Sequence, residues 1–301
     1  MKHIWYNNLV IVLLLLASCT PIDEKKSLGP LLTPSDIKLD VHGITTGSNK
    51  IVMINNTPNV GGMWYYGINT SIRQNDTILL PFLGNTTIYF YATTSGGITK
   101  DSVIVNVTKI DYPTAPQWEY LAGSGTAGKT WVWATDVLPP SGFPNFPSGQ
   151  CFGCGGYLAS EFVAPNWSTH GLLDLTKWGV ANDQMIFDLN GGANFTLVTG
   201  NTGVGGLPAG TYHGTFSFDM SKTLVGDNPP TLWSIGQLTL TGATVSEGFN
   251  RDNNNALIYT YDILVLNDDE MILASPDPGA ASAWDTAWIW IFKHQGYSFV
   301  Q

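Results

Sequence analysis

Short apolar runs of β type, each ended by turn residues, occupy most of this chain, and no segment has helical period and length. Runs rich in Val, Ile, Thr, Tyr and Phe that are bounded by Gly, Pro, Asn or Asp are typical of strands. The pattern therefore predicts an all-β protein. Six runs of this kind stand in the first third of the sequence: Ile37–Val41, Lys50–Ile54, Met63–Ile68, Thr77–Phe82, Thr87–Ala92 and Val103–Val107.

The strands divide into two predicted domains. Residues 36–110 are expected to form a small immunoglobulin-like β-sandwich, and residues 111–117, with two prolines, a linker. Residues 118–301 form the larger domain, whose clearest strand, Thr211–Asp219, places Tyr212, Phe216 and Phe218 on one face. We expect an antiparallel β-sandwich of jelly-roll type here, with a lipocalin-like barrel as the alternative.

The beginning of the chain indicates export. Residues 1–19 combine Lys2, a short apolar run and a small-residue site, the features of a signal peptide, and the run is shorter than the ~20 residues that span a bilayer. Its last four residues, Leu16–Cys19, resemble a bacterial lipobox, which implies lipidation of Cys19 and anchoring to outer-membrane lipid. An ordinary signal peptide that happens to contain Cys is the alternative. Residues 20–35 are a polar tether, and its Asp23–Glu24 pair resembles a surface-export signal, so the protein is expected to face the cell surface.

Composition restricts the partners. The chain has 23 Asp and Glu against 13 Lys and Arg, and a net charge of −10. An acidic surface disfavours nucleic acid and anionic polysaccharides, because both need a basic footprint. The sequence instead has few charged residues and 11 Trp, a composition that suits the binding of a neutral polysaccharide.

The remaining cysteines, Cys151 and Cys154, are predicted to form a structural disulfide. No second Cys pair or His pair completes a zinc site, and the flanking Pro and Gly residues do not fit a helix-opening redox motif. An oxidising compartment favours the disulfide. We expect no cofactor and no metal site, with a structural calcium ion left open.

An enzyme is the less favoured class. Glycosidases need two carboxylates that face one bond. Glu is scarce after the linker, no Glu has the Glu-x-Asp-x-x-Glu spacing of a catalytic strand, and Asp183 and Asp188, five apart, would face opposite sides of a strand. A glycoside hydrolase whose carboxylates come from distant strands stays as an alternative.

Tryptophan gives the clearest functional signal, since flat rings stack on the apolar faces of sugars. Trp131 and Trp133 share one strand face, and Trp288, Trp290 and Phe292 share another, which predicts core positions. Three further Trp residues lie in irregular segments, where binding residues are common. The predicted glycan-binding set is Trp167, Trp178, Trp284, Tyr157, Asn166, Asp183 and Asp285.

Three segments resemble the landmarks of a lipoprotein type of Bacteroidota: Leu121–Gly125, Gly128–Trp133 and Trp288–Lys293. In that type a PKD-like module precedes a β-rich C-terminal domain. The resemblance implies a surface glycan-binding lipoprotein of a polysaccharide-utilisation system that works beside an outer-membrane importer. A structural or adhesive lipoprotein without a sugar ligand is a third class.

Overall fold

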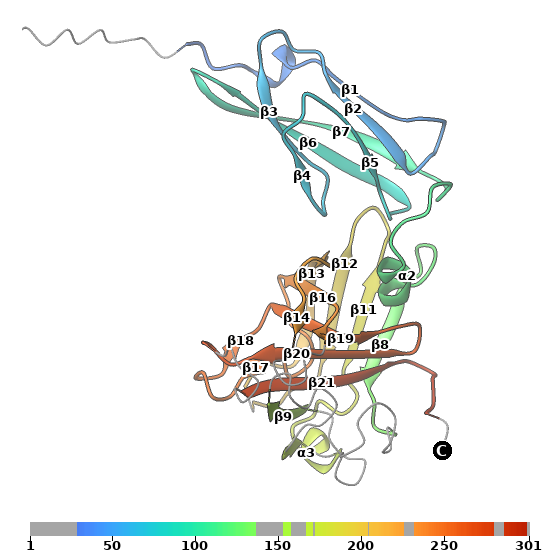
Figure 1. Ribbon diagram of the computed structural model, residues 1–301, viewed down its shortest axis with the longest axis vertical. Coiled ribbons are helices and arrows are strands. Elements are labelled where there is room, and N and C mark those ends of the chain that lie inside the picture. Colours follow the sequence, from blue (N-terminus) through green and yellow to red (C-terminus); the bar gives the residue numbers. More distant parts are fainter. Residues whose placement is uncertain are drawn as a thin grey trace, which may run out of the picture.

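The computed structural model describes residues 29–136, 153–157, 167–170, 172–203, 205–225, 232–279 and 286–299. Nearly all of the regular structure is antiparallel β-sheet, as predicted. The strands form two modules that follow one another along the chain (Figure 1).

The N-terminal module contains two sheets that enclose a common core. The burial pattern of the strands alternates, for example between buried and half-buried in β2, because successive side chains point to opposite faces. Met53, Trp64 and Phe90 are at most 1% exposed and lie in this core. A short 3-10 helix, η1 (Pro34–Asp36), precedes the strands. The first sheet has the order β1 (Leu39–Gly43), β2 (Lys50–Asn55), β5 (Asn75–Leu79); the second has the order β4 (Thr70–Ser71), β3 (Gly61–Tyr65), β6 (Gly84–Thr94), β7 (Gly97–Val107).

The C-terminal module is a closed barrel. Within the described residues, each of eight strands pairs antiparallel with the next, and the last, β21, pairs with the first, β8. The pairing forms the alternative that the sequence analysis named, a barrel, and not the jelly-roll sandwich that it preferred. The strands are β8 (Lys129–Trp133), β11 (Gln184–Asp188), β12 (Asn194–Thr199), β13 (Gly210–Asp219), β16 (Gly236–Thr241), β19 (Thr260–Leu266), β20 (Glu270–Pro276) and β21 (Thr286–His294).

Side chains fill the barrel, as expected for about eight strands. The predicted core positions of the tryptophans on β8 and β21 are confirmed, since Trp131, Trp133 and Trp290 are at most 3% exposed. Phe292 lies opposite Trp133 in register, and their ring centroids are 4.7 Å apart. Within the described residues these aromatic side chains are therefore part of a packed core.

Smaller elements surround the barrel. β21 is long enough to pair along its second half with β8 and along its first half with β9 (Gly153–Tyr157), which in turn pairs with β10 (Trp167–His170). Two helices, α2 (Gln117–Ala122) and α3 (Leu172–Lys177), have six residues each and were not predicted, because so few residues show no helical period. The described residues also contain two short antiparallel pairs: β14 (Leu224–Val225) with β15 (Leu232–Ser234), and β17 (Phe249–Asn250) with β18 (Ala256–Leu257).

The barrel therefore has two different ends. Helix α2 lies at one end, and since neighbouring strands alternate in direction, the β11–β12 and β19–β20 turns lie there too. We call this the α2 end. The β16–β19 connection, which contains β17 and β18, lies at the other, the β17 end (Figure 1).

The two modules contact each other at the α2 end. Leu83 donates its backbone N–H to Leu189 O at 3.0 Å, and the Phe82 ring meets the edge of Trp118. Two hydrogen bonds also fix the connection between the modules. Asn49 Nδ2 donates to Tyr112 O, and Tyr112 N donates to Asn49 Oδ1.

Candidate functional site

Most of the predicted glycan-binding residues cannot be placed. Trp167 and Tyr157 lie in β10 and β9, where the structure describes only the backbone, as it does for Cys154. The proposed binding, lipidation and disulfide roles of these residues stay predictions. The remaining predicted residues that lie outside the described part are Cys19, Cys151, Asn166, Trp284 and Asp285.

Asp183 is described, and it is buried, whereas a residue that binds a surface glycan is expected to be exposed. It lies just before β11 at the β17 end and is 3% exposed. Its carboxylate accepts hydrogen bonds from Gly200 N at 2.9 Å and from Ser246 Oγ at 2.6 Å. Ser246 also accepts a bond from Trp133 Nε1 at 3.2 Å. Asp183 thus holds two connections of the barrel together, and its binding role stays a prediction.

Trp178, the second described member of the set, lies just after α3 and is half-buried against the core. The guanidinium of Arg251 lies over its ring, with Cζ 4.9 Å from the ring centroid. A cation at this distance interacts favourably with an aromatic face. The described structure thus places an internal partner on this ring.

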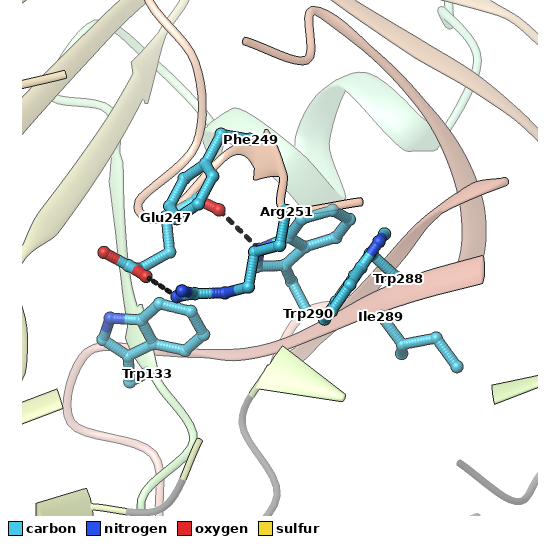
Figure 2. A pocket seen from close by; sticks show the side chains of 7 residues that line it. All are labelled: Trp133, Glu247, Phe249, Arg251, Trp288, Ile289 and Trp290. Atoms are coloured by element: carbon cyan, nitrogen blue, oxygen red, sulfur yellow. Dashed lines mark hydrogen bonds and ion pairs between the residues drawn. The ribbon is translucent and has the colours of Figure 1, made fainter. Parts of the chain in front are cut away.

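Arg251 belongs to a compact group that we call the β17-end cluster (Figure 2). Arg251 and Glu247 come from the β16–β19 connection, and Arg251 Nη2 lies 2.9 Å from Glu247 Oε2. Trp290 donates from Nε1 to Glu247 O at 3.1 Å. The cluster consists of Trp133, Glu247, Phe249, Arg251, Trp288, Ile289 and Trp290.

Glu247 is the electrostatically unusual member of this cluster. Its side chain is 5% exposed, and its Oε1 has no hydrogen-bond partner in the described structure. Burial raises the pKa of Glu247 to about 7, with a further increase from Asp183 and a partial decrease from Arg251. Burial also raises the pKa of Asp183. Carboxyl groups whose pKa is raised in this way can act as general acids.

The space at this cluster is nevertheless too small for a substrate. The cavity lined by the cluster measures about 10 Å³, roughly the room for one water molecule. Figure 2 shows Glu247 paired with Arg251, with the Trp133 ring beside this ion pair and the rings of Trp288 and Trp290 on the far side of Arg251. In the described structure this end therefore has the geometry of a closed, internally paired core.

The α2 end differs, because an open hollow of about 380 Å³ lies there. We call it the tyrosine groove, after the half-buried rings of Tyr120 from α2 and Tyr297 from the segment after β21. Its other lining residues form the β19–β20 turn. The full lining is Tyr120, Asn267, Asp268, Asp269, Glu270 and Tyr297.

Hydrogen bonds fix the walls of the groove. Lys129 is 9% exposed, and its Nζ donates to Tyr120 O at 2.8 Å and to Asp268 O at 3.1 Å. One buried ammonium group therefore joins α2 to the β19–β20 turn. Within the turn, Asn267 Oδ1 accepts the N–H groups of Asp269 and Glu270, each at 2.9 Å. A groove whose walls are held in this way loses little entropy when it binds a ligand.

The groove is acidic. Desolvation and then the carboxylates of Glu270 and Asp269 raise the pKa of Tyr297, so its phenol stays protonated at neutral pH and can donate a hydrogen bond. Carboxylate and phenol groups around two aromatic rings match the mixed polar and apolar faces of a sugar. The same carboxylates repel an anion.

No family model matches the chain, and a search of curated proteins found no significant match. Among the described residues, no helix is long and apolar enough to cross a membrane. In that same part of the chain, no three His, Cys, Asp or Glu side chains are grouped as metal ligands would be.

No sequence pattern indicates the two tyrosines of the groove. Tyr120 lies in a helix of six residues, and Tyr297 follows the last strand, so neither belongs to a periodic pattern. One signal was available. The polar residues Asn267–Glu270 stand between two apolar runs, which is the pattern of a hairpin turn, and the pairing of Leu266 with Met271 shows that turn. Loops on a rigid sheet are common binding positions, so this acidic turn was a candidate.

Proposed function

We propose that this chain is a non-catalytic, lipid-anchored surface protein that binds a neutral polysaccharide through the tyrosine groove. The observation that supports the proposal most directly is the combination of Tyr120 and Tyr297 with four polar residues around an open hollow of about 380 Å³. This volume lies in the range of ordinary ligand pockets, ~300–1,000 Å³.

The chemistry of the groove fits the ligand class. Tyrosine rings offer flat apolar area at low entropic cost, and they suit the C–H faces of pyranose rings. Asp268, Asp269 and Glu270 can accept hydrogen bonds from sugar hydroxyls. The acidic lining disfavours uronic or sulfated chains, in line with the net charge of −10.

The cellular setting of this proposal rests on the sequence. Lipidation of Cys19 would attach the protein to the outer membrane, and the PKD-like kinship of residues 36–110 would make that module a spacer. Export beside an importer complex belongs to the same proposal. Replacing Cys19 by Ala should move the protein from the membrane fraction to the soluble fraction, and unchanged fractionation would contradict the lipid anchor.

Affinity electrophoresis tests the binding. The whole chain is run through native gels that contain β-glucan, glucomannan, xylan or starch. We expect one polymer to retard the wild type, and Tyr297→Ala or Tyr120→Ala to lose most of that retardation. Tyr259→Ala is the matched control, because Tyr259 is 39% exposed and lies before β19 at the β17 end. Absence of retardation in every gel, or equal loss in the control, would contradict the proposal.

A hydrolase is the second candidate, since the raised pKa values of Glu247 and Asp183 would suit an acid–base pair. It requires the β17-end cluster to open, because the cavity of about 10 Å³ admits no sugar. Reducing-sugar release measured in the same mixtures decides between the two functions. Release that disappears in Glu247→Gln would establish the hydrolase, and binding without release supports the non-catalytic protein.

A further inference from the structure

A second hollow lies beside the tyrosine groove, between the two modules. It measures about 160 Å³. The N-terminal module contributes Pro81, Leu83 and Ile110, and Leu189 comes from the turn after β11. The remaining lining residues are Thr114, Trp118, Glu119, Gly123, Ser124 and Gly125.

Contacts from both modules fix the aromatic wall of this interdomain hollow. The ring centroid of Trp118 lies 6.1 Å from that of Phe82 in the N-terminal module. It also lies 5.5 Å from that of Phe216 and 5.1 Å from that of Phe218 in the barrel. Three neighbouring rings thus pack around the indole, and Leu83 N donates to Leu189 O beside it, which joins the two modules.

Helix α2 lies between the two hollows. Leu121 and Ala122 are completely buried, so the opposite side of the helix faces outward. Glu119 and Tyr120 are consecutive there, about 100° apart around the axis. Glu119 lines the interdomain hollow, and Tyr120 lines the tyrosine groove. A ligand that extends beyond one hollow can therefore cross α2 and enter the other.

From this juxtaposition we infer that the interdomain hollow is a second sugar subsite, and that the ligand is an internal stretch of a polysaccharide chain that crosses α2. The inference rests on the function proposed above. In the hollow, Trp118 supplies an aromatic wall, and Glu119, Ser124 and Thr114 supply hydrogen-bonding groups. On this inference the N-terminal module is more than the spacer proposed above, because the hollow is incomplete without Pro81 and Leu83.

The expected consequence is a dependence of affinity on chain length. On this inference a disaccharide occupies one hollow, whereas a hexasaccharide occupies both. A ligand that occupies both hollows binds more tightly, because its second contact forms intramolecularly once the first is made. We expect the hexasaccharide of the retarding polymer to bind at least about tenfold more tightly than its disaccharide.

Ser124→Trp tests the subsite, since Ser124 is exposed on the loop after α2 and an indole at this position would fill the hollow. Isothermal titration of the whole chain should show weaker hexasaccharide binding in this variant, with the disaccharide affinity unchanged. Ser102→Trp is the control, because Ser102 is exposed on β7 and lines neither hollow. Matching melting temperatures establish that both variants are folded.

The outcomes separate the two proposals. If no saccharide binds to the wild type, the proposed function fails. If the wild type binds both saccharides with equal affinity, or if Ser124→Trp binds the hexasaccharide as well as Ser102→Trp does, the second subsite is wrong and the tyrosine groove alone holds the ligand.

Discussion

The two ends of the barrel use similar residues in opposite ways. At the β17 end, indole rings surround an ion pair, and Glu247 and Asp183 are almost completely buried. At the α2 end, the rings of Tyr120 and Tyr297 border an open hollow together with exposed or half-exposed carboxylates. Aromatic and acidic residues together therefore do not define a binding site. Whether their polar groups are already paired, and whether space remains beside them, distinguishes a core from a site.

The largest expected effect is a difference in how much a substitution at each end of the barrel lowers the stability of the fold. Trp133→Ala should lower the free energy of unfolding by ~3–5 kcal/mol, because a 2% exposed indole leaves a cavity. Tyr297→Ala should change it by less than about 1 kcal/mol, since the ring is partly exposed. Urea unfolding of both variants measures the difference. Equal destabilisation would mean that the α2 end is as much a core as the β17 end.

The next effect concerns pH at the β17 end. The pKa of Glu247 is about 7 in the folded chain against an ordinary value of 4.5. The folded state therefore binds more protons between these values, and stability falls as pH rises from about 5 to 8. The Glu247 contribution to this fall is up to roughly 3 kcal/mol.

Glu247→Gln tests the pH effect, because it removes the titrating group at the same size. The urea midpoint of each protein is measured at about pH 5 and about pH 8. Between these two pH values it should fall less in the variant than in the wild type. Identical pH dependence in the two proteins would show that Glu247 is not the group responsible. Asp183 should contribute a loss of stability with rising pH as well, because burial also raises its pKa.

A third effect tests how the groove is held. Lys129→Met removes the ammonium group that joins Tyr120 O to Asp268 O. It should destabilise the chain by ~1–3 kcal/mol, because two partly buried carbonyl acceptors lose their partner. It should also weaken polysaccharide binding although Lys129 does not line the groove. Titration calorimetry of the folded variant measures this, and unchanged affinity would show that the groove forms without Lys129.

The smallest expected effect is that of salt. A neutral ligand should lose less than about twofold in affinity when ionic strength rises tenfold, because screening acts on charges. The measurement is a titration of the wild type at low and high salt. A much larger loss would indicate a charged ligand and would contradict the choice of neutral polysaccharide.

The sequence predicted the strands and the core better than the site. Alternation along Trp131–Trp133 and Trp288–Phe292 correctly placed these rings inside, because burial of a strand face leaves a period of two. Closure of the barrel depends on the pairing of Phe292 with Trp133 across almost the whole module, and no local pattern encodes it. The same long-range packing determines that Asp183 is buried, whereas its irregular sequence context suggested a surface residue.

Hydrogen–deuterium exchange of the whole chain, with and without the hexasaccharide of the retarding polymer, tests the central claim most directly. The proposed site predicts added protection in the β19–β20 turn, Asn267–Glu270, and in the residues around Tyr297, with no change across the connection that carries Glu247 and Arg251. Protection confined to that connection would contradict it, and would place the ligand at the β17 end of the barrel.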